Sequence, residues 1–179
     1  ILGLDFFSVA FELLKATGAV VLEAEGKNAG CWVMPLEGTP EFAGLEDPDK
    51  VIVRSDGTVT YVGKDIAYQL WKFGLLGKDF AYRYWREAGL WVTAREGAED
   101  HPAFGRGANV INVIDARQSS LQKIVRAGLS ALGHHDAAAR SVHFAYEMVT
   151  LSPATAKALG DLAAEGDEGR AMEMSGRKG

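Results

Sequence analysis

Tyr61 and Asp65 are four residues apart at the start of a predicted helix, so both side chains can lie on one face, one turn apart. An ionised aspartate accepts two parallel hydrogen bonds from a guanidinium, and a neighbouring tyrosine ring offers a face on which that planar cation stacks. The pair therefore suits a ligand that carries a guanidinium. A structural alternative stays open, in which Asp65 favours the positive end of the helix dipole and Tyr61 packs in the core.

Gln118 lies just past the strongest buried-strand pattern of the chain, residues 109–114. Its amide could read a polar ligand at the edge of a sheet, or it could face solvent at the start of the next helix. Asp115 and Arg117, close by, could equally form a local ion pair.

His143 opens a second apolar strand and is followed by Phe144 and Tyr146. A histidine with aromatic neighbours could cradle a nucleobase, although a lone strand histidine commonly packs and hydrogen bonds within the fold. His134 and His135 have no third ligand nearby in the sequence, so we expect no metal site.

The last six residues, Met174 to Gly179, form a small cationic segment that includes Ser175, Arg177 and Lys178. Cations between glycines can swing over a triphosphate and stabilise the charge that develops as pyrophosphate leaves. The segment is not a P-loop, because no GxxxxGK[ST] pattern occurs in the chain. It could also be only a disordered basic end.

Hydrophobic periodicity and turn residues define the elements that would position these side chains. They predict helices at 4–15, 65–73, 119–132 and from Ser152 onward, and strands at 19–22, 31–36, 50–54, 109–114 and 143–151. The first two strands form a predicted hairpin, and 79–107 reads as a loop-rich connection with short strands at 81–82 and 90–92.

The last 70 or so residues alternate strand, helix, strand and helix, which predicts parallel pairing in a doubly wound α/β sheet. Ligands of such sheets bind outside the carboxyl ends of the strands. We therefore expect any site to lie near residues 115–118 and the loop after Val149.

Composition is that of a globular domain, with 47% hydrophobic and 24% charged residues. The net charge of −5 argues against this chain binding a phosphate backbone unaided.

No apolar run reaches the roughly 20 residues of a membrane helix. Cys31 is expected to be a small buried residue, and a single cysteine favours a reducing, cytoplasmic compartment. Residues 1–5 lack an initiator Met and a signal-peptide pattern, so we expect a piece of a longer chain.

In order along the chain, these residues resemble the arginyl-tRNA synthetases, which are class I aminoacyl-tRNA synthetases. The resemblance covers nearly the whole chain and is weakest at 79–107 and 150–172. It is carried by Lys27-Asn28-Ala29-Gly30-Cys31-Trp32-Val33, by Arg54-Ser55-Asp56-Gly57-Thr58 continuing through Tyr61 and Asp65 to Ala67, by Val113-Ile114-Asp115-Ala116-Arg117-Gln118, by His143-Phe144-Ala145-Tyr146, and by Met174 to Gly179.

The resemblance implies a Rossmann-like parallel sheet, the second half of a class I catalytic domain, with a small inserted β/loop region. Residues 1–179 would be a partial catalytic domain, in which 19–54 form the hairpin or insert region and 55–179 the second half of the nucleotide-binding fold. The family activates arginine with ATP to arginyl-adenylate and transfers it to arginine tRNA, which it generally needs even for activation. Mg²⁺ would accompany ATP as substrate, with no tightly bound cofactor, and most tRNA contacts would lie outside this chain.

Residue by residue, the resemblance implies three groups of site residues. Tyr61 and Asp65 would recognise the guanidinium of arginine, and Gln118 would hold the amino-acid end. His143, Phe144, Tyr146 and Met174 would bind ATP, and Ser175, Arg177 and Lys178 would supply the catalytic groups of the Lys-Met-Ser-Lys-Ser loop.

The chain also departs from the family's pattern. It contains no His-Ile-Gly-His motif, which is expected N-terminal to Ile1, and nothing like the family's helical anticodon-binding domain. Glu173 and Gly176 occupy the places of the loop's two usual lysines, Glu147 replaces a glycine, and Leu121 stands where many relatives have histidine. We therefore expect a ligase fragment that is inactive alone; the alternative is a non-catalytic half-Rossmann module that binds arginine or a nucleotide.

Overall fold

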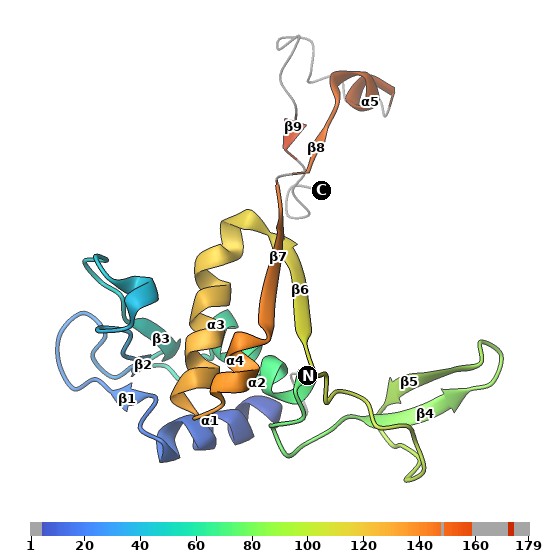
Figure 1. The fold of residues 1–179 in the computed structure, drawn as a ribbon, viewed down its shortest axis with the longest axis horizontal. Helices are drawn as coiled ribbons and strands as arrows, with labels where there is room; N and C mark the ends of the chain where they lie inside the picture. Colours follow the sequence, from blue (N-terminus) through green and yellow to red (C-terminus); the bar gives the residue numbers. More distant parts are fainter. Residues whose placement is uncertain (1–4, 148, 159–171, 174–179) are drawn as a thin grey trace.

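The computed structural model describes residues 5–147, 149–158 and 172–173. The helices are α1 (Phe6–Ala16), α2 (Tyr61–Lys72), α3 (Ser119–Ala131), α4 (His135–Ala139) and α5 (Pro153–Ala158), with short 3₁₀ turns at Pro40–Phe42 and Ala116–Gln118. The strands are β1 (Val21–Leu22), β2 (Trp32–Met34), β3 (Lys50–Val53), β4 (Ala81–Trp85), β5 (Leu90–Ala94), β6 (Val110–Asp115), β7 (Ser141–Tyr146), β8 (Thr150–Leu151) and β9 (Met172–Glu173) (Figure 1).

The strands form four small sheets in the described part of the chain. Strands β1, β2 and β3 make an antiparallel sheet, which contains the predicted hairpin, and β4 with β5 and β8 with β9 are antiparallel pairs. Strands β6 and β7 run parallel, as predicted, over six residue pairs from Val110↔Ser141 to Asp115↔Tyr146. The described residues therefore form a mixed α/β fold, and the wider doubly wound sheet expected from the sequence is not seen among them.

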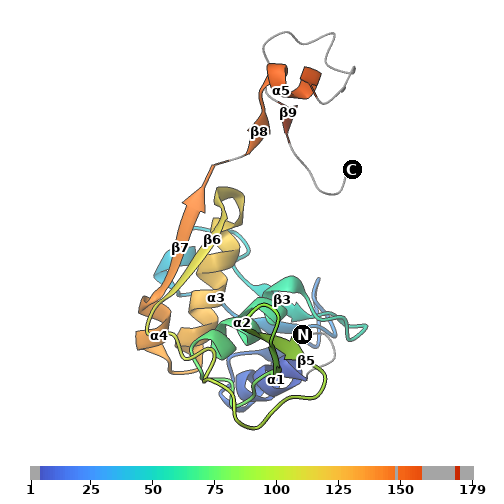
Figure 2. The same ribbon diagram turned by 90° about the vertical axis from the view of Figure 1, so that its right-hand side faces the viewer.

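The core lies where α2 packs between α1 and α3 (Figure 2). Each helix contributes residues three or four apart, the spacing that places apolar side chains on one helical face. The buried set is Phe6, Ala10 and Leu14 of α1, Val62, Ile66 and Leu70 of α2, and Ile124, Val125 and Leu129 of α3. Gly128 allows α3 to approach closely, because a Cβ there would lie 3.0 Å from Cδ1 of Ile66.

Helix α2 begins at Tyr61, four residues before the predicted start. Thr60 precedes it in extended conformation, and its hydroxyl donates to the carbonyls of Val51 (3.0 Å) and Ile52 (3.1 Å) on β3. This anchoring on β3 lets the helix begin at Tyr61. The predicted end is confirmed, with Gly74 at φ 72° after the last turn.

Two other sequence predictions were wrong in detail. The strand predicted at 143–151 is divided, because β7 runs from Ser141 to Tyr146 and β8 covers only Thr150–Leu151. The short helix α4 was not predicted, since five residues are too few to show a helical period.

Asp79 joins the β4–β5 hairpin to α2. Its Oδ1 accepts hydrogen bonds from the indole N–H of Trp71 (2.8 Å), the hydroxyl of Tyr82 (2.9 Å) and the backbone N–H of Phe80 (2.7 Å). Burial disfavours the charged carboxylate, but these hydrogen bonds outweigh that effect and lower the pKa of Asp79 below its usual value. The ionised carboxylate thus holds the hairpin more strongly than the protonated acid would.

We expect Asp79→Ala to lower the free energy of unfolding by about 1 kcal/mol near pH 7, because three donors lose their acceptor. Since the folded-state pKa is depressed, this contribution is fully present above pH 3.8 and disappears as the pH falls through the folded pKa. Urea unfolding of both proteins at pH 6 and below pH 3.8 measures this, and a difference that grew toward low pH would contradict it.

Among the described residues, helices cover only one face of the β6–β7 pair. Val110, Asn112 and Ser141 are buried on the helix side, whereas the alternate side chains face outward and are 43–63% exposed. The outward set is Ile111, Val113, Val142, Phe144 and Tyr146. A contiguous apolar face of this kind promotes association.

We expect residues 1–179 expressed alone to self-associate through this face. Val113→Lys combined with Phe144→Lys should reduce the association, because it places charge at the centre of the face. Light scattering across a concentration series measures this. A monodisperse monomer of the unmodified chain would contradict the prediction, and Leu90→Lys, an exposed change on β5, is the matched control.

Candidate functional site

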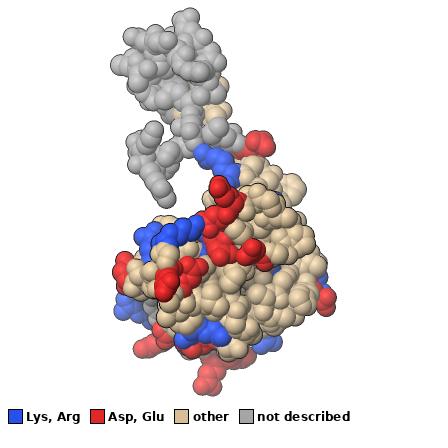
Figure 3. Space-filling view, turned by 90° about the vertical axis from the view of Figure 1, so that its left-hand side faces the viewer, with Lys and Arg blue, Asp and Glu red and all other residues tan. Residues whose placement is uncertain are grey.

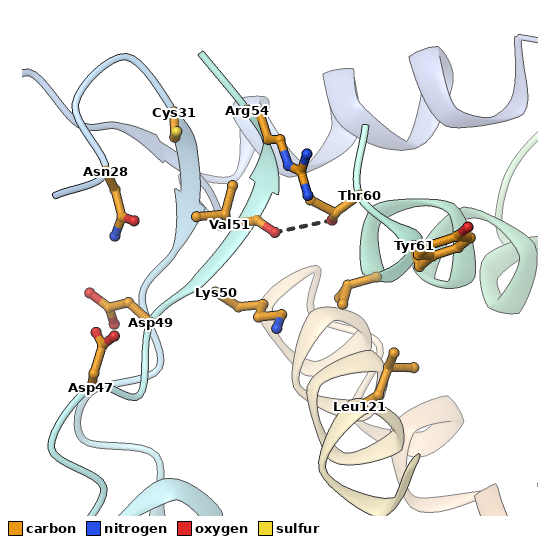
Figure 4. A pocket seen from close by; sticks show the side chains of 11 residues that line it. Asn28, Cys31, Asp47, Asp49, Lys50, Val51, Arg54, Thr60, Tyr61 and Leu121 are labelled. Carbon is orange, nitrogen blue, oxygen red and sulfur yellow. Dashed lines mark hydrogen bonds between the residues drawn. The ribbon is translucent and has the colours of Figure 1, made fainter. Parts of the chain in front are cut away.

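A cavity of about 510 Å³ lies between the β1–β2–β3 sheet and the first residues of α2 (Figure 4). Leu121 of α3 closes another side. The lining residues are Asn28, Cys31, Asp47, Asp49, Lys50, Val51, Arg54, Thr60, Tyr61, Val62 and Leu121. Residues of the sheet and its loops, of the start of α2 and of α3 therefore line one cavity.

Both signs of charge line this cavity. Lys50 is the first residue of β3 and Arg54 follows its last residue. In Figure 4 the Lys50 side chain extends toward α3. Asp47 pairs with Lys27, and the Asp49 carboxylate accepts a hydrogen bond from the Leu36 N–H (3.0 Å). Acidic and basic side chains also lie interspersed on the face of the molecule that Figure 3 shows.

Tyr61 is the first residue of α2 and is 74% exposed. It is therefore not a packed core residue, the alternative that its sequence left open. The ammonium of Lys64 lies 5.7 Å from the centroid of its ring. The ring of Tyr61 can therefore bind a cation on its face at the edge of the cavity.

Asp65 lies one turn further along α2 and is half-buried. It belongs to the second turn of the helix, so a role in the first turn does not explain it. Burial raises the pKa of Asp65, and the charge of Lys72 partly opposes this rise. Within the described chain Asp65 forms no ion pair, and it is not among the residues that line the cavity.

Gln118 is exposed and stands where the 3₁₀ turn after β6 meets α3. Leu121, one turn later, lines the same cavity as Tyr61. The alternative ion pair is confirmed: Arg117 donates from Nε to Oδ1 and from Nη2 to Oδ2 of Asp115, both at 2.9 Å. These bonds and the Arg117 backbone N–H lower the pKa of Asp115.

His143 and its aromatic neighbours point to opposite faces of the parallel pair. His143 is half-buried on the helix side, with Nε2 2.9 Å from the carbonyl oxygen of Ile114 on β6. Phe144 and Tyr146 alternate with it and lie on the bare face, 63% and 43% exposed. The described structure therefore does not bring the three predicted ATP-binding side chains together.

No family model matches this chain. It is 38% identical over 173 residues to the arginine–tRNA ligase of Deinococcus radiodurans, which covers 94% of this chain and 28% of that protein. It is 40% identical over 172 residues to the Thermus thermophilus ligase, a match that covers 95% of this chain and 25% of that protein. It is also 40% identical over 149 residues to the ligase of Pyrococcus abyssi, which covers 83% of this chain and 23% of that protein. The solved Thermus thermophilus arginyl-tRNA synthetase superposes with a TM-score of 0.71 at 32% identity, over 93% of this chain and 30% of that one.

The chain is homologous to one region of the arginyl-tRNA synthetases. It spans about a quarter of the length of the curated relatives it matches. The resemblance found in its motifs is thereby confirmed.

Of the residues assigned by resemblance to arginyl-tRNA synthetases, four lie outside the described part of the chain. These are Met174, Ser175, Arg177 and Lys178. The last described residue before them, Glu173, pairs with Thr150 in the β8–β9 ladder.

The sequence analysis did not identify a hydrogen-bonded set of polar residues that joins the later turns of α2 to α3, β6 and β7. We call it the α2–β6 network, and its members are Gln69, Lys72, Asn112, Gln122 and Ser141. One signal could have found part of it. Positions 61, 65, 69 and 72 are all polar or aromatic and recur at helical spacing, which predicts a second, polar face on α2. Cys31 was expected to be buried but is half-buried and lines the cavity.

In the part of the chain that the structure describes, no three His, Cys, Asp or Glu side chains gather as a metal site would require. Nor is any described helix long and apolar enough to cross a membrane.

Proposed function

We propose that the polypeptide containing this chain is an arginine–tRNA ligase that activates arginine with ATP and transfers it to arginine tRNA. One observation carries the proposal: a half-buried carboxylate that forms no ion pair within the described part of the chain lies one turn from an exposed tyrosine, in a chain homologous to these ligases. A residue pair of this kind suits a planar cation better than a spherical one.

In this proposal the guanidinium of arginine donates two hydrogen bonds to Asp65 and stacks against Tyr61, where it displaces the Lys64 ammonium. Gln118, beyond the carboxyl end of β6, holds the amino-acid end of the substrate. Neutral citrulline and the compact ammonium of lysine would each leave Asp65 poorly paired, which is how the site would reject them.

The remaining assignments extend the same proposal. ATP, with Mg²⁺ as its counter-ion, would bind beside β7, with His143 contributing from the helix side of the strand, Phe144 and Tyr146 from the opposite face, and Met174 from the loop. Ser175, Arg177 and Lys178 would stabilise charge on the leaving pyrophosphate.

The proposal includes an architecture and a cellular location. The parallel β6–β7 pair would belong to a Rossmann-like sheet, with 55–179 as its second half and 19–54 as the insert region. Arginine tRNA would be held mostly by surfaces outside this chain, in keeping with the mixed charges here, and the enzyme would act in the cytoplasm.

Asp65→Ala in the complete polypeptide should raise the arginine KM by at least about 100-fold, because the substrate loses a charged bidentate partner worth about 3 kcal/mol. It should also largely abolish discrimination against citrulline. Steady-state kinetics with both substrates measure this. The matched control is Glu87→Ala, which removes an exposed carboxylate between β4 and β5, outside the proposed contacts, and should change the KM by less than about threefold. Unchanged arginine kinetics in Asp65→Ala would remove the assignment.

The function itself is tested by arginine-dependent ATP–pyrophosphate exchange with the complete polypeptide, with and without arginine tRNA. We expect exchange that requires the tRNA. A folded protein that binds arginine in calorimetry but shows no exchange in either condition would instead be the non-catalytic binding module.

A further inference from the structure

Helix α2 has a polar face that is partly buried, which is uncommon because buried polar groups need partners. Gln69 is 2% exposed on this face, and Lys72 is half-buried one turn later. Asp65 is on the same side, one turn before Gln69. The polar face of α2 therefore extends from Asp65, the proposed arginine contact, to the buried Gln69.

Asn112 of β6 is the centre of the α2–β6 network. Its Oδ1 accepts from the Lys72 ammonium at 2.7 Å, and its Nδ2 donates to Gln122 of α3 at 3.0 Å and to Gln69 at 3.3 Å. Gln69 in turn donates to the Ser141 hydroxyl of β7 at 2.8 Å. Two helices and two strands thus fix the orientation of the Asn112 amide, and a buried network with its partners satisfied is rigid.

Lys72 is the charged side chain whose field acts on Asp65, and Asp65 acts on Lys72 in return. Their positions on α2 are two turns apart, roughly 10 Å along the axis. Helical side chains lean toward the amino terminus, so the long Lys72 side chain leans toward Asp65. Yet the two form no ion pair; the ammonium is bonded to Asn112 and lies 4.7 Å from the Tyr68 ring centroid.

We propose that Asn112 is a tether that holds the Lys72 ammonium off Asp65, so that the carboxylate stays available to the guanidinium of an incoming substrate. Without the tether, Lys72 would turn to Asp65 and compete with arginine as an internal cation. Asn112 is thus a positioning residue that sets affinity for arginine without touching it. This inference rests on the proposed function, because it concerns the same carboxylate.

The test is arginine KM and kcat in tRNA-dependent exchange by the complete polypeptide. Asn112→Ala should raise the arginine KM at least about fivefold with little change in kcat, because a local cation now occupies Asp65. Adding Lys72→Met should return the KM to near the wild-type value. A purely structural role for Asn112 would not be rescued by removing Lys72, so absence of rescue in a folded double variant overturns the proposal.

Two further variants keep the proposal falsifiable. Ser141→Ala is the matched control, since it removes another bond of the network but leaves the Lys72–Asn112 contact, and it should lower stability without raising the arginine KM. Lys72→Met alone should not raise the KM. A steep rise in Lys72→Met would mean that Lys72 assists binding, and would overturn the tether even where Asn112→Ala fails to fold.

The outcomes separate this inference from the proposed function. Wild-type exchange that is absent, or that does not depend on Asp65, removes the function. Exchange that depends on Asp65 but not on the Asn112–Lys72 contact removes only the tether.

Discussion

Helix α2 packs against an apolar core on one side and hydrogen bonds with buried polar groups on another, and the rest of the fold depends on this double contact. One side buries Val62, Ile66 and Leu70 in the core, and the other places Gln69 and Lys72 against β6. A small rotation of the helix would expose apolar side chains and break buried hydrogen bonds together, and each unpaired buried group costs about 1–3 kcal/mol. The helix therefore has one rotational setting, which fixes where Asp65 points.

Close contacts restrict the position of α2 along its axis as well. A Cβ at Gly63 would lie 2.8 Å from Cε2 of Phe7 and 3.1 Å from Cγ2 of Ile52, so the first turn lies directly against α1 and β3. The Thr60 hydroxyl adds hydrogen bonds to β3 at the same level. The cavity and the exposed Tyr61 ring are consequences of this anchored start.

The sequence predicted those features whose signals are local. Helices α1 and α3 and the strand–helix–strand order of β6, α3 and β7 follow from periodicity and turn residues within short windows. The start of α2 did not follow, because the bonds from Thr60 to Val51 and Ile52 join residues nine and eight apart in sequence. The extent of the parallel sheet also depends on pairing between distant segments, which periodicity does not encode.

The candidate site likewise contains residues that local spacing predicts and residues that it does not. Tyr61 and Asp65 were found because four-residue spacing on a helix brings them together. The separation of His143 from Phe144 follows from strand alternation, since neighbouring residues of a strand point to opposite faces. Asn112 gave no signal: it stands among apolar residues in a strand, and its partners Gln69 and Lys72 are 43 and 40 residues away.

Strand β6 buries the polar Asn112 on its helix side, while Ile111 and Val113 on its other face are more than 60% exposed. The effect of a substitution here therefore depends on what covers the bare face. In the uncovered chain, Val113→Thr loses little apolar contact and improves solubility. Beneath another protein surface the same change would forfeit burial worth about 25 cal/mol per Å² and leave a hydroxyl in need of a partner. Stability measurements on the chain alone would thus understate the cost of polar substitutions at Ile111 and Val113 in a larger assembly that covers this face.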